Sequence, residues 1–140
     1  MASGKSNFLA KKIADVMYGA VAYTTVTPVY FALWTAALSV TSTGATAGEA
    51  SYTGYARVSV TNNATNFPAA SGAGTASKAN GGTAITWPQN TATANTVISA
   101  AICDASTAGN MMHWGDITST VINVLDTPQI AISGFALTES

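Results

Sequence analysis

The amino-acid sequence predicts a mainly β fold: a single β-sandwich or jelly-roll-like domain with one N-terminal amphipathic helix. Three observations support this prediction. Only one segment repeats its apolar residues with helical spacing, and about seven short segments are rich in β-branched and aromatic residues. Clusters of Gly, Asn, Asp, Ser or Pro separate these segments. A chain of 140 residues normally makes one domain with its own core, and no internal repeat divides it.

The N-terminal region is predicted to have two parts. Residues 1–5 are expected to form a flexible arm, and residues 6–18 the helix. Ser6 or Asn7 can cap the first turn through a side-chain oxygen, and Gly19 can end the helix in the left-handed conformation. Five apolar residues share one face of this helix: Phe8, Leu9, Ile13, Val16 and Met17.

The remaining residues, 19–140, are predicted to form the β-sandwich. Strands are expected at residues 25–36, 55–61, 83–87, 97–103, 111–117, 121–125 and 129–135. The strand at 25–36 has apolar side chains on both faces, so we expect it to be buried on both sides or docked on a partner. Residues 67–82 are predicted to be a loop, and residues 104–110 the turn of a hairpin.

The composition indicates a part of an assembly. Only 8% of the residues are charged, against about a quarter in an ordinary soluble domain. A surface of small neutral groups costs little to desolvate, because few ions must lose their water. The formal net charge of −1 gives no reason to expect nucleic acid or anionic lipid as a partner.

Membrane insertion and secretion are not expected. No charged residue occurs between Met17 and Gly48, but Thr, Pro and Ser residues interrupt this stretch. Lys11, Lys12 and Asp15 lie where a signal peptide would be apolar. We therefore expect the chain to stay in the cytosol where it is made.

Few residues of this sequence are suited to catalysis or metal binding. The single cysteine, Cys103, is expected to be a buried hydrophobe, although a small hydrolase using Cys103 and His113 is an alternative. Asp104, His113 and Asp116 are too few for a convincing metal site, and turn-capping aspartates are the simpler interpretation. No catalytic residue, metal ligand or cofactor site is predicted.

Two sets of side chains have alternative roles. Arg57 either anchors a carboxylate or carbonyl of a partner or braces a neighbouring loop, and it joins the five helix residues as a candidate interface residue. Four aromatic residues are expected in the core, with a sugar-stacking platform as the alternative: Tyr52, Tyr55, Trp87 and Trp114.

Several stretches resemble a family of small virion proteins of tailed bacteriophages, labelled capsid decoration (cement), tail fibre or structural proteins. The resemblance covers residue 6 to about residue 117, and such relatives often have a second Gly where this chain has Ala108. It rests on Ser6-Asn7-Phe8-Leu9 with Gly19 and Tyr23, on Pro28 to Thr35, on Gly54-Tyr55-Ala56-Arg57, and on Ile102 to Gly115.

The resemblance implies a non-enzymatic component of the virion. The preferred interpretation is a capsid decoration protein that binds the major capsid protein and stabilises the head, as a homo-oligomer and preferably a trimer. A tail, baseplate or tail-fibre component, with receptor binding as one role, is the alternative.

Overall fold

The computed structural model describes residues 2–73 and 76–139 and confirms the mainly β fold class. Within these residues the chain forms one helix, α1 (Asn7–Gly19), and nine strands. The strands are β1 (Ser3–Lys5), β2 (Val29–Trp34), β3 (Val58–Val60), β4 (Ala76–Ala79), β5 (Ile85–Thr86), β6 (Asn95–Cys103), β7 (Met111–Ile122), β8 (Gln129–Ile130) and β9 (Ala136–Glu139).

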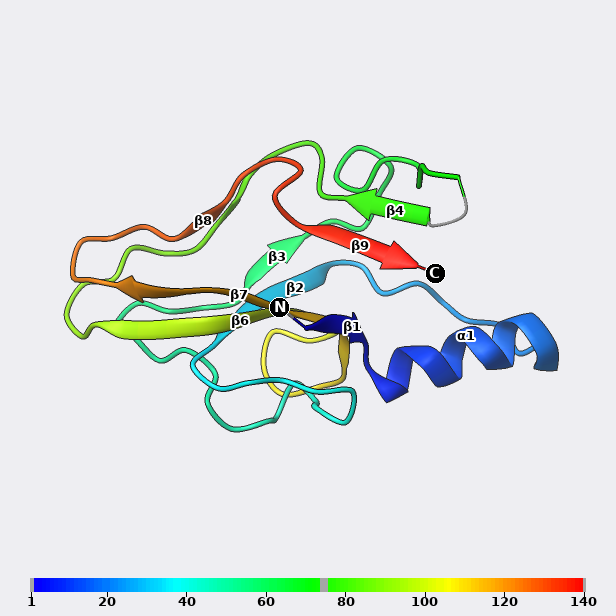
Figure 1. Ribbon diagram of the computed structural model, residues 1–140, viewed down its shortest axis with the longest axis horizontal. Helices are drawn as coiled ribbons and strands as arrows, with labels where there is room; N and C mark the ends of the chain where they lie inside the picture. The colour runs from blue at the N-terminus through cyan, green and yellow to red at the C-terminus, as the bar shows by residue number, and fades with distance from the viewer. Residues whose placement is uncertain (1, 74–75, 140) are drawn as a thin grey trace.

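Five of the strands form an antiparallel sheet in the order β1-β7-β6-β2-β3 (Figure 1). Its longest pairing is the hairpin of β6 and β7, which aligns Ala101 with Trp114 across the two strands. The turn at residues 104–110 connects them, as the sequence predicts. This hairpin and β2 form the centre of the sheet.

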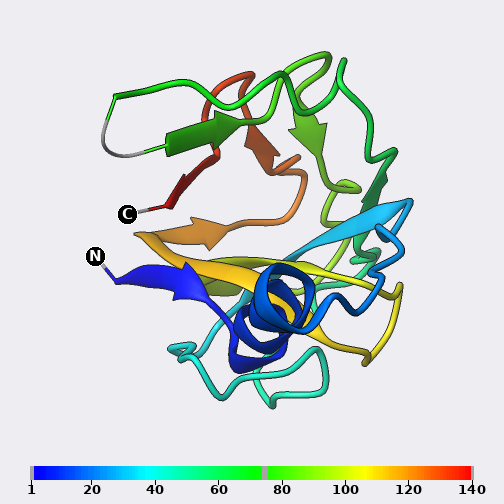
Figure 2. The same ribbon diagram turned by 90° about the vertical axis from the view of Figure 1, so that its right-hand side faces the viewer.

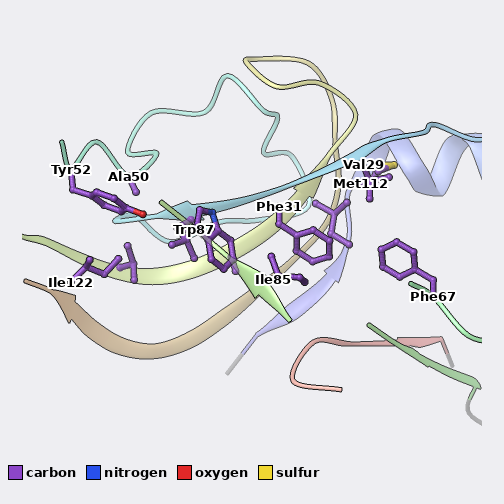
Figure 3. Packing of buried hydrophobic residues seen from close by; sticks show 13 residues of the cluster. Val29, Phe31, Ala50, Tyr52, Phe67, Ile85, Trp87, Met112 and Ile122 are labelled. Carbon is purple, nitrogen blue, oxygen red and sulfur yellow. The ribbon is translucent and has the colours of Figure 1, made fainter. Parts of the chain in front are cut away.

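A second layer covers one face of the sheet. It consists of two separate two-stranded ribbons, β4 with β9 and β5 with β8, which lie above the sheet in Figure 2. The main core lies between the layers, where the ring of Phe31 stacks on Phe67 at 6.3 Å and meets Phe135 edge-on at 5.2 Å. Figure 3 shows Ile85 and Trp87 packed beside Phe31 in this core.

The other face of the sheet carries a smaller buried cluster. Trp34, Cys103 and Met111 are fully buried there, and the loop after β2, cyan in Figure 2, runs beneath them. The indole N–H of Trp34 donates to the carbonyl of Thr46 in that loop at 3.1 Å. The prediction that the strand after Pro28 is buried on both sides is therefore confirmed for Val29–Trp34.

The structure differs from the sequence-based expectations in several elements. Residues 3–5, expected to be flexible, pair with the edge of β7 as β1, and the carboxylate of Asp116 accepts the N–H of Ala2 at 2.8 Å. Residues 76–79, expected in a loop, pair with β9. The two strands expected at 111–117 and 121–125 are one strand that ends at Ile122. Pairing with segments far away in the chain produces β1 and β4, and pairing with β6 makes β7 one continuous strand.

The helix forms where it was predicted. Ser6 is its N-cap and accepts the N–H of Leu9 at 3.3 Å, while its hydroxyl donates to the carbonyl of Met111. The helix ends one residue later than expected, because Ala20, with φ 52°, adopts the left-handed conformation that we assigned to Gly19. No helix in the described part of the chain has the length and apolar character to span a bilayer.

Candidate interaction surface

The helix and the segment that returns from it project from one end of the sheet. We call residues 7–28 the helical arm; in Figure 1 it extends to the right of the sheet, and in Figure 2 it points at the viewer. None of the 13 residues of α1 is buried. The structure shows that only the base of this helix meets the sheet.

The five predicted helix residues divide along the arm. Phe8 and Leu9, at the base, are half-buried, and the ammonium of Lys12 lies 5.9 Å from the ring of Phe8. Further along, 41% of Ile13, 42% of Val16 and 67% of Met17 remains exposed.

Two exposed apolar residues at the end of the arm were missed by the sequence analysis. The exposed fractions are 90% for Tyr18 and 52% for Val21. Tyr18 was treated only as the last helical residue, and Val21 lies beyond the helix. Together with Met17 they form what we call the arm tip. Its exposure leaves apolar area that contact with another surface would bury.

Two hollows follow the same arm. The arm groove, of about 220 Å³, runs along α1 and is lined by Leu9, Lys12, Ile13, Val16, Met17 and Tyr23. The base pocket, also of about 220 Å³, lies where the arm joins the sheet. Its lining is mostly apolar and includes Val26, Ile102, Met112 and Leu137, with Asn62 and Lys78 among the polar residues. Leu9 and Tyr23 line both hollows, so the two adjoin.

Arg57 is engaged within its own chain. Its side chain is 1% exposed, and its Nε and Nη2 both donate to the carboxylate of Glu49, each at 2.7 Å. Nη2 also donates to the carbonyl of Gly44 at 2.6 Å, and Nη1 to the carbonyls of Ala105 and Ala108 at 2.8 and 2.9 Å. These bonds use all five N–H donors of a guanidinium. The geometry is that of the loop-bracing alternative, and no donor is left for a partner's carboxylate.

The surroundings of Arg57 keep it charged. Burial by itself would lower the pKa of the guanidinium, but the hydrogen bonds and charge of Glu49 outweigh burial and raise that pKa above its ordinary value. The guanidinium carbon also lies 5.6 Å from the centre of the Trp34 ring, a cation–π distance. The buried ion pair thus ties the loop after β2 to the turn between β6 and β7.

The structure does not bring Cys103 and His113 together. Cys103 is fully buried in the smaller cluster, and desolvation raises the pKa of its thiol to about 11. His113 lines the base pocket with Ile102 and Met112, on the opposite face of the sheet. The two side chains therefore lack the contact that an activated thiolate requires.

The acidic residues of the hairpin have structural partners. The carboxylate of Asp104 accepts the backbone N–H and the side-chain amide of Asn110, both at 2.7 Å, which is the expected turn-capping role. The carboxylate of Asp116 accepts the backbone N–H of Ala2, the residue directly before β1. Among the residues that the structure describes, no three His, Cys, Asp or Glu side chains gather closely enough to hold a metal ion.

The four aromatic candidates lie in the interior rather than on a platform. Tyr52, Trp87 and Trp114 are buried, and the Tyr52 hydroxyl donates to the carbonyl of Pro88 at 3.0 Å. Tyr55, half-buried, accepts the N–H of Leu33 and donates to Glu49. Their expected place in the core is confirmed.

Comparison with known proteins supplies one match. The family model described as "Podophage GP4 fiber I protein gp80" matches residues 4–138. No curated protein matches the chain. The matched range includes the helical arm and all of the five-stranded sheet and the second layer except Ser3 at the start of β1 and Glu139 at the end of β9.

Proposed function

Because the chain belongs to the podophage GP4 fiber I protein gp80 family, a family of phage structural proteins, we propose that it is a subunit of a tail-fibre-type appendage of the virion. The match over residues 4–138 is the observation that supports this proposal. It favours the tail-fibre alternative of the sequence analysis over capsid decoration. The role is structural: the chain contributes surface and stiffness, not catalysis.

The features of the molecule suit such a subunit. Because the chain has few charged residues, removing water from its surface against neighbouring subunits costs little free energy. The buried Arg57–Glu49 pair holds two loops in one arrangement. The helical arm, by contrast, exposes apolar side chains away from the body of the domain. A braced domain with one projecting apolar arm is the form expected of a protein that joins others.

We assign the contacts with neighbouring virion subunits to the apolar residues of α1, from Leu9 to Met17. The proposed partners are other proteins of the particle, including further copies of this chain. Burying one such side chain completely contributes about 1.5–3 kcal/mol, of which ordering and lost motion on binding offset a part.

The location of the protein on the particle tests this function. Phage particles carrying an epitope tag on this chain would be purified, labelled with gold-conjugated antibody, imaged, and their copy number measured by quantitative mass spectrometry. We expect labels at the tail and a small copy number. Untagged particles provide the background. Labels over the whole head, with hundreds of copies per particle, would instead establish a decoration protein on the major capsid protein.

A further inference from the structure

We propose that the base pocket binds a free aliphatic carboxylate, with an alkyl chain of about seven carbons inside the pocket and the carboxylate beside Lys78. The pocket lies where the helical arm joins the sheet, between the sheet and the second layer. This inference goes beyond the function proposed above, because a fibre subunit needs no small ligand to join its neighbours.

The first argument is that the pocket continues the core of the domain. Figure 3 shows Val29, Met112 and Phe67 at the end of this core beside α1. Protein interiors are close-packed, so an apolar hollow that reaches core side chains leaves part of their surface without neighbours. An alkyl chain in the hollow would supply those contacts. Four lining residues, each less than a tenth exposed, belong to the main core: Val29, Phe67, Ile102 and Met112.

The second argument is the size of the pocket. Its volume of about 220 Å³ exceeds the roughly 150 Å³ of an apolar cavity that holds benzene. If one methylene takes about the 30 Å³ of a water molecule, the pocket holds roughly seven carbons. Burial of each methylene tightens binding about fourfold. A chain of this length therefore gains affinity from burial, whereas a two-carbon acid has almost no chain to bury.

The third argument is charge. The described lining residues include Lys78 and His113 but no Asp or Glu. The register of the β4–β9 ribbon places Lys78 directly opposite Leu137, so both side chains project from the same face, and both line the pocket. One N–H of the Lys78 ammonium donates to the carbonyl of Pro68 at 2.9 Å, and an ammonium has three. The remaining donors are complementary to a carboxylate, which has two acceptor oxygens.

The charge of the chain favours a dissolved ligand over a lipid in a bilayer. The formal net charge is −1, whereas binding to anionic lipid takes a cluster of several Lys or Arg residues. One lysine at a pocket with room for one short chain suits a single dissolved molecule.

NMR chemical-shift titration of the ¹⁵N-labelled full-length chain tests the ligand, with sodium octanoate and sodium hexanoate as probes. We expect octanoate to shift the amide signals of Val26, Ile102 and Leu137, which line the pocket. Its affinity should exceed that of hexanoate about fifteenfold, because two more methylenes are buried.

Two kinds of substitution separate the alkyl chain from the charge. Lys78→Met should weaken octanoate about fivefold and leave octan-1-ol unchanged, because only the carboxylate loses its partner. Val26→Phe should weaken both ligands about tenfold, because the larger side chain occupies the pocket. Leu137→Trp gives the same test if Val26→Phe does not fold. The matched control is Lys11→Met, which removes one charge from the exposed side of α1 and should change neither affinity.

Absence of octanoate binding at about 20 mM would overturn the proposal, as would an affinity that does not rise from hexanoate to octanoate. Equal weakening of octanoate and octan-1-ol by Lys78→Met would contradict a carboxylate beside this lysine. Unchanged binding in the variants that fill the pocket would contradict the site. Binding of the chain to phosphatidylglycerol vesicles, without any shift caused by octanoate, would also overturn the proposal. Tail labelling would still establish the fibre function in each of these cases.

Discussion

The five hydrogen bonds of Arg57 join two loops that the sheet itself does not connect. Glu49 and Gly44 belong to the loop after β2, and Ala105 and Ala108 to the turn of the β6–β7 hairpin. Ala108 has φ 49°, a conformation that favours glycine. Its bond to Arg57 is one of the contacts that hold this strained residue in place.

Replacing Arg57 by methionine should lower the free energy of unfolding by about 3–5 kcal/mol, because the carboxylate and three carbonyls lose their donor. Urea denaturation followed by tryptophan fluorescence measures this change. Lys11→Met is the matched control: it also removes one positive charge, but from the exposed side of α1, and should change stability by less than about 0.5 kcal/mol. A loss below about 1 kcal/mol for Arg57→Met would show that water replaces the guanidinium at little cost.

Among the elements, α1 ends with its two last residues in the less favourable order. Gly19 occupies a helical position, where glycine is unfavourable, and Ala20 occupies the left-handed position, where glycine is preferred. A Cβ at Gly19 would meet only the side chain of Val21, at an ordinary 3.6 Å. Exchanging the two residues therefore removes both costs without a clash.

The double substitution Gly19→Ala with Ala20→Gly should stabilise the end of α1 by about 1–2 kcal/mol. Because the arm can open without global unfolding, amide hydrogen exchange in the last turn is the appropriate measurement, and exchange should slow. Ala14→Gly, in the exposed middle of the same helix, should accelerate exchange by an amount equivalent to about 1 kcal/mol. If amide hydrogen exchange in the last turn of the double variant were unchanged, contacts other than these two residues would determine the end of the helix.

At the scale of the whole molecule, the burial of one thiol and two tyrosine hydroxyl groups lowers the free energy of unfolding at high pH. Desolvation raises the pKa of Cys103 to about 11 and that of Tyr52 to about 12, and it raises the pKa of Tyr55 as well. In the unfolded chain these groups lose their protons at their ordinary, lower pKa values. Above those values the unfolded state binds fewer protons than the folded state, so stability falls as pH rises.

The contribution of Cys103 should be fully present below about pH 8.5 and lost as the pH rises toward 11, with a slope of at most about 1.4 kcal/mol per pH unit. Urea denaturation at pH 7, 9, 10 and 11 measures this loss. Cys103→Ala should be less stable at pH 7, because it leaves a cavity, but should lose stability less steeply between pH 9 and 10. Parallel curves for the two proteins would contradict a buried, protonated thiol.

Local sequence patterns predicted the elements whose signals are local. The apolar runs of β2 and β6, the turn at 104–110 and the capped helix were all found. Three strands were missed, β1, β4 and β9; they consist mostly of small or polar residues and have no strand signal of their own. They exist because segments far away in the chain offer them backbone partners: β7 pairs with β1, and β4 and β9 pair with each other.

The residues of the candidate surface were also predicted only where they have a local signal. Helical spacing identified Ile13, Val16 and Met17, which the structure leaves exposed on the arm. Val21 carries no periodic signal, because it lies after the helix, and it was missed. For Arg57 the sequence offered two roles of equal weight, and the positions of Glu49 and the two loops decide between them.

The sequence by itself determined the mainly β class, the N-terminal helix with its N-cap, and a low content of charged residues, because each follows from composition or from neighbours within a few residues. Only the tertiary structure decided that β1 extends the sheet, that Arg57 is used internally, and that α1 projects instead of lying on the second layer. These features depend on contacts between residues far apart in the chain. Such contacts form only when the whole domain has folded, and no local pattern encodes them.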